Sequence, residues 1–204
     1  MAATVGVLAL QGAFGLHTEA LHRCGVNGIE VRQPSQLDDI DALIIPGGES
    51  TTMSKLMVEF DMVDPISTRI ADNMPVFGTC AGMIMLASGL VDGRSDQVLL
   101  GAIDLSVRRN AYGRQLASFE AELDFHPEVL ASPDSEFSES ENSFVGVFIR
   151  APGVERLGAG VEVLASVEQA PVLCQQGSVL VASFHPELTS DDRIHRLFLR
   201  SLDS

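Results

Sequence analysis

The first half of the chain alternates short apolar runs with longer helical stretches, and this alternation sets the narrowest limit on its fold. Apolar runs of strand length lie at 4–10, 29–32, 42–45 and 76–77. Helices are expected at about 14–23, 50–60, 64–73 and 81–88. A strand that reads as a continuous apolar run is buried on both faces, as in a parallel sheet. The chain is therefore predicted to form a mostly parallel central sheet between two helical layers, a three-layer α/β/α fold.

The expected helix starts rest on capping patterns. Ser50 or Thr51 is expected to cap the second helix. Asp64-Pro65 is typical of an N-cap followed by the first helical residue. Ser190 is expected to cap a last helix at 191–202, whose apolar residues share one face.

The second half is richer in expected strands, and residues 1–204 are expected to form a single domain. Strand candidates lie at 98–107, 119–123, 143–149, 161–167, 172–175 and 179–184. Between two of them, the acidic segment at 126–142 carries five acidic side chains and no basic one. We predict that this segment is a mobile surface loop, with a phosphorylated or partner-binding loop as the alternative.

The charge balance excludes several classes of partner. The chain has 13 basic and 28 acidic residues and a net charge of −15, which would repel nucleic acid and anionic lipid surfaces. Three cysteines argue for free thiols in a reducing compartment. The apolar N-terminal run lacks the basic flank of a signal peptide, and no apolar stretch reaches the roughly 20 residues of a membrane span. We expect a cytoplasmic protein that needs neither a metal nor a cofactor.

The most informative motif is G-T-C-A-G at 78–82, between a short expected strand and a helix. Small residues around a reactive side chain are typical of a nucleophile elbow, here with cysteine in place of serine. The turn would put the Cys80 sulfur near a helix N-terminus, whose positive dipole stabilises a thiolate. The alternative is a glycine-flanked structural cysteine, and this motif alone does not decide between the two.

A histidine follows an apolar strand near the end of the chain, in the motif F-H-P-E at 184–187. His185, at the carboxyl end of a strand, is well placed to face a site on a parallel sheet and to accept the Cys80 proton. Glu187 could orient the other ring nitrogen. Alone, H-P-E is more typical of a surface turn, but with the cysteine elbow it completes a nucleophile, a base and an orienter.

The third motif is P-G-G-E-S at 46–50, after one expected strand and before a helix. Two glycines let the backbone approach a ligand or an oxyanion closely. Glu49 could meet a substrate ammonium group. Taken alone, the motif is equally typical of an ordinary turn between a strand and a helix.

Together, these three motifs resemble those of class I glutamine amidotransferases. Further motifs resemble one family among them, the glutaminase subunits of pyridoxal 5′-phosphate synthase. These motifs are G-V-L-A-L-Q-G at 6–12, P-G-G-E-S-T-T-M at 46–53, R-N at 109–110, Y-G-R-Q at 112–115, F-E-A at 119–121 and G-V-F-I-R-A-P at 146–152. The resemblance covers nearly the whole chain. The departure is the acidic segment, which is longer and more acidic than the family leads us to expect.

The resemblance implies a class I glutamine amidotransferase-like fold and hydrolysis of L-glutamine through a γ-glutamyl thioester. Ammonia would pass to a separate, barrel-shaped synthase subunit. By position, Cys80 is the implied nucleophile, His185 the general base and acid, and Glu187 its orienter. Such subunits are expected to complete their oxyanion hole only when docked, so the isolated chain would be a poor glutaminase.

The resemblance also implies where glutamine binds. The matching positions are Gly47, Gly48, Glu49, Ser50, Arg109, Ile149 and Arg150. The guanidinium of Arg109 or Arg150 would pair with the substrate carboxylate. Backbone N–H groups of Gly47 or Gly48, and of Ala81, would hold the oxyanion.

Other polar residues are expected to have ordinary roles. His17 and His22 are not spaced as an i, i+4 metal pair. Gln11, at the end of the first expected strand, could contact the partner or the site loop, or could serve the turn. Structural or solvent-facing roles are expected for Cys24, Cys174 and His195.

Two alternative functions remain open. One keeps the superfamily but changes the pathway, as in the glutaminase of imidazole glycerol phosphate synthase. The other is a non-enzymatic relative that keeps the fold as a binding module. The presence of Cys80, His185 and Glu187 together argues against the second alternative.

Overall fold

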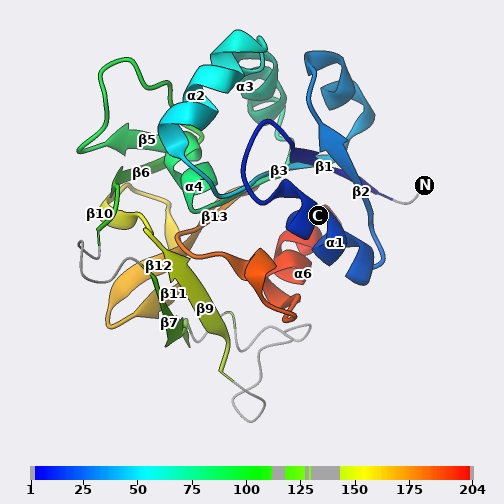
Figure 1. The fold of residues 1–204 in the computed structure, drawn as a ribbon. Coiled ribbons are helices and arrows are strands. Elements are labelled where there is room, and N and C mark those ends of the chain that lie inside the picture. The colour runs from blue at the N-terminus through cyan, green and yellow to red at the C-terminus, as the bar shows by residue number, and fades with distance from the viewer. Residues whose placement is uncertain (1–2, 112–117, 127–128, 130–142, 203–204) are drawn as a thin grey trace.

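An eight-stranded sheet runs through the centre of the protein (Figure 1). The computed structural model describes residues 3–111, 118–126, 129 and 143–202. Across the sheet the strand order is β2 (Asn27–Val31), β1 (Thr4–Leu8), β3 (Ala42–Ile45), β4 (Val76–Thr79), β13 (Val179–Ala182), β12 (Ala170–Gln176), β11 (Glu162–Val167) and β8 (Asp124–Phe125). Every pairing from β2 to β13 is parallel, and the last three are antiparallel. The predicted mostly parallel sheet is confirmed.

Helices cover both faces of this sheet, which confirms the predicted three layers (Figure 1). On one face lie α2 (Ser50–Glu59), α3 (Val63–Ala71) and α4 (Ala81–Leu86), and on the other lie α1 (Phe14–Arg23) and α6 (Arg193–Leu199). Short 3₁₀ turns are η1 (Pro34–Asp39), η2 (Pro186–Leu188) and η3 (Arg200–Leu202).

The central strands send alternate side chains into two separate cores. In β3, Leu43 and Ile45 pack under α2 and α4, whereas Ile44 packs on the side of α1 and α6. In β13, Val181 likewise packs on the side of α2 and α4, and Leu180 packs on the side of α1 and α6. Because side chains alternate across a strand, a strand covered on both faces must be apolar throughout. This is why these strands read as unbroken apolar runs.

Two small sheets lie beside the central one. The first contains β10 (Gly153–Leu157), β6 (Ile103–Arg108) and β5 (Ala87–Leu90), and the second contains β7 (Ser118–Glu122) and β9 (Val145–Ile149). Two expectations were wrong here: the helix expected at 81–88 ends at Leu86 and continues as β5, and the strand expected from 98 begins at Ile103. The strand β10 was not predicted, because three of its five residues are exposed and a register shift interrupts its pairing with β6.

The capping predictions were wrong in detail. Glu49, rather than Ser50 or Thr51, is the N-cap of α2. The helix α3 begins at Val63 with Met62 as its N-cap. Asp64 is therefore not the N-cap, and Pro65 is the third helical residue rather than the first. At α6, Asp191 Oδ1 accepts the Arg193 N–H at 3.1 Å, which leaves no capping role for Ser190.

Two regions named above lie largely outside the described residues. Of the acidic segment at 126–142, only His126 and Val129 are described, and the motif at 112–115 is not described. Within the described ranges, no helix is both long enough and apolar enough to cross a membrane.

Close packing of α4 against the sheet depends on a glycine. A Cβ at Gly82 would lie 2.0 Å from the carbonyl oxygen of Ile45 in β3. Such an approach is impossible for any side chain, so only glycine lets the first turn of α4 rest on the strand. The residue before that turn is Cys80, whose position therefore depends on this contact.

We predict that Gly82→Ala destabilises the protein, because the added methyl group forces α4 away from the backbone of β3. The expected loss is about 1–3 kcal/mol in the free energy of unfolding, measured by urea denaturation. The matched control is Gly15→Ala in α1, where an added Cβ meets nothing within 4 Å. That control should leave stability unchanged or raise it by up to about 1 kcal/mol. Equal stabilities for the two variants would contradict the packing argument.

Candidate active site

Cys80 occupies a strained turn between β4 and α4. Its backbone has φ 48° and ψ −101°, a left-handed conformation that costs a non-glycine residue about 1–3 kcal/mol. Its N–H donates to the Ala182 carbonyl oxygen of β13 at 2.8 Å, which ties the turn to the neighbouring strand. The side chain is largely buried, with 6% exposed. The structure thus has the predicted elbow, with the thiol at the carboxyl end of a central strand.

His185 reaches the same edge of the sheet from β13. Thr79 pairs with Ala182 in the parallel register, so the chain leaving β13 meets the turn leaving β4. The His185 Nδ1 atom lies 2.7 Å from Glu187 Oε1, and Cys80 is near enough to the ring to raise its pKa. Since Nδ1 is engaged by the carboxylate, Nε2 is the nitrogen left for the sulfur.

Strand β9 supports both reactive side chains. The His185 N–H donates to the Val147 carbonyl oxygen at 2.8 Å. The Cys80 Sγ lies 3.8 Å from the Ile149 carbonyl oxygen. These contacts place the expected motif at 146–152 directly over the cysteine and the histidine.

His185 and Glu187 form a charged pair despite their burial. Burial lowers the pKa of His185, but its interactions with Cys80 and with the accepting carboxylate of Glu187 outweigh burial and raise that pKa to about 10. Burial tends to raise the pKa of Glu187, but the nearby His17 and the hydrogen bond from His185 hold it below its usual value. His185 is therefore an imidazolium at neutral pH, and Glu187 is a carboxylate.

A small pocket opens beside the sulfur. Its volume is about 170 Å³, below the range of about 300–1,000 Å³ that suits drug-sized ligands. It therefore fits a molecule of amino-acid size. Its lining is Gly48, Glu49, Ser50, Cys80, Ile84, Arg109, Asn110, Ile149, Arg150 and His185.

The structure brings nearly all predicted site residues to this pocket. Gly47 lies behind it: a Cβ there would be 2.3 Å from His185 Cε1 and 3.3 Å from Cys80 Cβ. Ala81 is the first residue of α4 and is fully buried. Sequence reasoning missed Ile84 and Asn110 as lining residues, although Ile84 lies one helical turn after Cys80.

Charges of both signs line the pocket. The Arg109 guanidinium is held by Thr51 Oγ1 at 3.2 Å and by the Asp92 carbonyl oxygen at 3.3 Å. The Glu49 carboxylate accepts from the backbone N–H groups of Thr51 and Thr52 at 3.0 and 2.7 Å. Desolvation opposes the ionised form of Glu49, but these hydrogen bonds dominate and lower its pKa to about 2. The pocket thus offers a fixed cation and a fixed anion, as a zwitterionic amino acid requires.

Gln11 and His195, which the sequence did not place in the site, both have contacts near it. Gln11 lies against the site loop, since a Cβ at Gly48 would be 1.7 Å from its Nε2 atom. His195 is fully buried, so the expectation that it is solvated was wrong. Its ring faces inward because it lies next to Ile194 on the buried side of α6, where it meets His17. Across the described parts of the chain, no group of three or more metal-ligating side chains is arranged to hold a metal.

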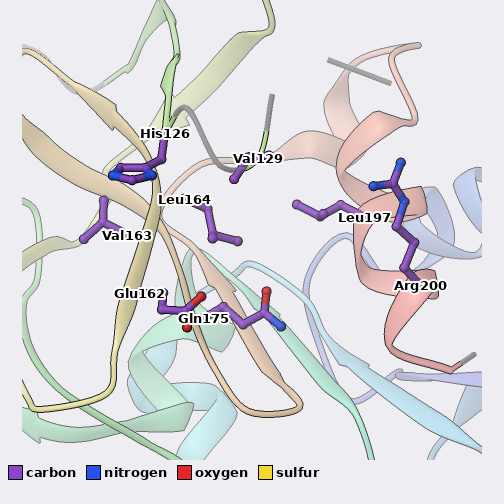
Figure 2. Close-up of a pocket in the computed structure, with 8 residues that line it drawn as sticks. All are labelled: His126, Val129, Glu162, Val163, Leu164, Gln175, Leu197 and Arg200. Atoms are coloured by element: carbon purple, nitrogen blue, oxygen red, sulfur yellow. The ribbon is translucent and has the colours of Figure 1, made fainter. Parts of the chain in front are cut away.

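A second, larger hollow lies at the other end of the sheet (Figure 2). It has a volume of about 390 Å³ and is lined by His126, Val129, Glu162, Val163, Leu164, Gln175, Leu197 and Arg200. Gln175 pairs with Leu180 early in β13, whereas His185 follows the end of that strand. None of the predicted catalytic or glutamine-binding residues lines this hollow, so we place the reactive site at the smaller pocket.

Comparisons with known proteins agree with this geometry. The sequence profile of the SNO glutamine amidotransferase family matches residues 7–204. A pyridoxal 5′-phosphate synthase subunit PdxT from Mycobacteroides abscessus is 50% identical over 199 residues, covering 98% of this chain and 97% of the relative. The PdxT subunit of Pelotomaculum thermopropionicum is 52% identical over 195 residues, covering 96% and 93%.

Solved structures show the same likeness. A crystal structure of a glutamine amidotransferase superposes with a TM-score of 0.86 at 48% identity, covering 98% of this chain and 99% of that one. PurLQS from Thermotoga maritima gives a TM-score of 0.72 at 15% identity, covering 99% and 100%, and supports the fold alone.

We predict that His185 keeps its proton through neutral pH and loses it only as the pH rises towards about 10. In Glu187→Gln the carboxylate that stabilises the imidazolium is gone, so His185 should deprotonate at a lower pH. The measurement is an NMR titration of the His185 ring. The matched control, Glu30→Gln, neutralises a carboxylate that pairs with Arg32 on the surface, and should leave the His185 titration unchanged. An unaltered midpoint in Glu187→Gln would contradict the assigned contact.

Proposed function

The chain belongs to the SNO glutamine amidotransferase family, and from this premise we propose that it is the glutaminase subunit of a pyridoxal 5′-phosphate synthase. It hydrolyses L-glutamine to L-glutamate and ammonia, and the ammonia serves the synthase subunit in vitamin B6 biosynthesis. The observation that carries this proposal is the Cys80–His185–Glu187 group at the edge of a pocket of amino-acid size. The names of the PdxT relatives support the pathway.

The first half of the reaction uses the imidazolium as an acid. The Cys80 thiolate attacks the side-chain amide carbon of glutamine and forms a carbon–sulfur bond, and the carbonyl becomes an oxyanion. As the carbon–nitrogen bond breaks, His185 gives its proton to the departing nitrogen, which leaves as ammonia. The product is a γ-glutamyl thioester on Cys80 beside a neutral His185.

The second half uses the same histidine as a base. Once Cys80 is acylated, its thiolate no longer raises the pKa of His185, and burial favours the neutral ring. His185 then takes a proton from a water molecule, which attacks the thioester carbon. Glutamate leaves, and the thiolate and the imidazolium are restored. The same histidine can therefore serve both steps, because acylation removes the Cys80 contribution that raises its pKa and so makes the neutral ring easier to reach.

Substrate orientation follows from the two fixed charges of the pocket. We assign the α-carboxylate of glutamine to Arg109 or Arg150 and its ammonium group to Glu49, which stays ionised. Ser50 and Ile149 complete this end of the pocket. The oxyanion is assigned to the backbone N–H groups of Gly48, which lines the pocket with Cys80, and of Ala81, which follows Cys80 in the chain.

The proposal extends to the partner and the setting of the enzyme. The acceptor of ammonia is a barrel-shaped synthase subunit, and neither nucleic acid nor a membrane is a partner, in keeping with a net charge of −15. The enzyme works in the cytoplasm, whose reducing conditions keep the Cys80 thiol free. The chain acts as a single glutaminase domain, since both of its halves contribute catalytic residues.

We predict that the chain releases ammonia from glutamine rapidly only when the synthase subunit is present. The measurement is the rate of ammonia formation with and without that subunit. Cys80→Ala should abolish the reaction in both cases. Cys24→Ala, which removes a partly buried thiol from the end of α1, should keep full activity. Equal rates with and without the partner would contradict assembly of the oxyanion hole on docking, and turnover by Cys80→Ala would overturn the glutaminase assignment.

We predict that Arg109→Ala raises KM for glutamine about 10- to 100-fold while kcat changes far less, because a charge-assisted bond to the substrate carboxylate is lost. Steady-state kinetics of the complex with its synthase subunit would measure both constants. The control is Arg94→Ala, which removes an exposed guanidinium paired with Asp96 and should leave KM unchanged. A fall in kcat at constant KM would assign Arg109 to the reaction step instead.

A further inference from the structure

A pair of buried histidines lies directly behind Glu187, on the side away from the pocket. His17 from α1 and His195 from α6 are both fully buried. The His17 Nδ1 and His195 Nε2 atoms are 2.9 Å apart, which is a hydrogen bond. The His17 Nε2 atom lies 3.1 Å from Thr79 Oγ1 and 3.4 Å from Glu187 Oε2. The proposed mechanism leaves this pair without a role.

The carboxylate fixes the direction of these contacts. Glu187 binds His185 through Oε1, and within the described structure its buried Oε2 atom has no hydrogen-bond partner. The polar atom that faces Oε2 is His17 Nε2 at 3.4 Å, whose own hydrogen bond is to Thr79 Oγ1 at 3.1 Å. A carboxylate oxygen can only accept, so a proton on His17 Nε2 suits this contact, and the Thr79 hydroxyl oxygen can accept from the same N–H. A bare nitrogen there would place two lone pairs against each other in a dry interior.

The tautomer of the second histidine follows. With its proton on Nε2, a neutral His17 can only accept at Nδ1, so His195 must donate from its Nε2 atom. The His195 Nδ1 atom is then left bare, and it is indeed buried without a partner among the described residues. A lone acceptor costs less to bury than a lone charged group, which makes this chain of two donated hydrogen bonds self-consistent.

The surroundings keep both rings neutral. Burial lowers the pKa of His17, while Glu187 raises it and His185 lowers it further. Burial also lowers the pKa of His195 well below its usual value, and the positive charge of Arg23 lowers it further. The Phe77 ring meets both imidazoles edge-on at 6.4 and 6.1 Å between centroids, which adds an apolar wall.

We propose that His17 is a positioning residue of the glutaminase reaction: its Nε2–H lies against Glu187 Oε2 and so holds the carboxylate against His185, with His195 fixing the required tautomer of His17. This role rests on the glutaminase function proposed above. Without that N–H, no polar group holds the buried Oε2 atom of Glu187 in place. The carboxylate can then move away from the His185 ring. The imidazolium then becomes less stable, and so does the Cys80 thiolate that it stabilises.

The test compares His17→Leu with His17→Gln. Leucine removes the donor and keeps the apolar bulk, whereas the glutamine amide offers an N–H to Glu187 and an oxygen to His195. In the complex with the synthase subunit, His17→Leu should lower kcat about 10- to 100-fold with KM nearly unchanged, and His17→Gln should recover most of that loss. A packing role alone would predict equal losses for the two variants.

A second readout does not depend on glutamine or on the partner. The rate at which iodoacetamide alkylates Cys80 reports its thiolate, and peptide mass mapping separates it from Cys24 and Cys174. In His17→Leu the midpoint of this rate against pH should rise by about one unit, and in His17→Gln it should stay at the wild-type value. Unchanged midpoint and kcat in His17→Leu would overturn the proposal.

If His17→Leu does not fold, the unmodified protein still decides the question. Nitrogen NMR of the imidazoles should show His17 and His195 neutral and protonated at Nε2 from pH 6 to pH 9. A charged His17, or one protonated only at Nδ1, would overturn the proposal. A wild-type complex that releases no ammonia would instead refute the glutaminase function, and the alkylation and NMR results would remain interpretable without it.

Discussion

The contact between α4 and the backbone of β3 is the constraint on which the site depends. Because Gly82 lets the helix rest on the Ile45 carbonyl oxygen, the chain must turn from β4 into α4 within one residue. That residue is Cys80, and the sharpness of the turn forces its backbone into a left-handed conformation. The strain keeps the thiol at the edge of the sheet, where the chain that leaves β13 can reach it.

Electrostatic interactions between buried side chains also hold the site together. A buried imidazolium and a buried carboxylate would each be costly alone, but side by side each charge is stabilised by the other. The contacts do not end at Glu187, since His17 and His195 continue them as neutral partners towards α6. Helices from both ends of the chain therefore support a carboxylate that never touches the substrate.

The parts of the structure that could be predicted were those with a local signal. The glycines around Cys80 predicted the tight turn, and the apolar strand before His185 predicted that this histidine lies near Cys80. Both signals are local, because tight turns and buried strands restrict residue type. The burial of His195 could not be predicted, since it depends on His17, which is distant in sequence. The cap of α2 was missed although its contacts are local, because the Glu49 carboxylate takes a role in which Ser, Thr, Asp and Asn are the usual residues. The strand β10 was missed because its exposed Glu155 and Arg156 break any alternation.

The pairing of β4 with β13 has a consequence for how the chain becomes active. Cys80 and His185 are more than a hundred residues apart in sequence, and they meet only when those two strands pair. Such distant contacts form late, because the entropy of closing a long loop must be overcome first. A chain emerging from the ribosome therefore presents Cys80 well before the base proposed for it exists. A chain that stops before residue 179 lacks both β13 and His185, so it cannot carry out the proposed reaction.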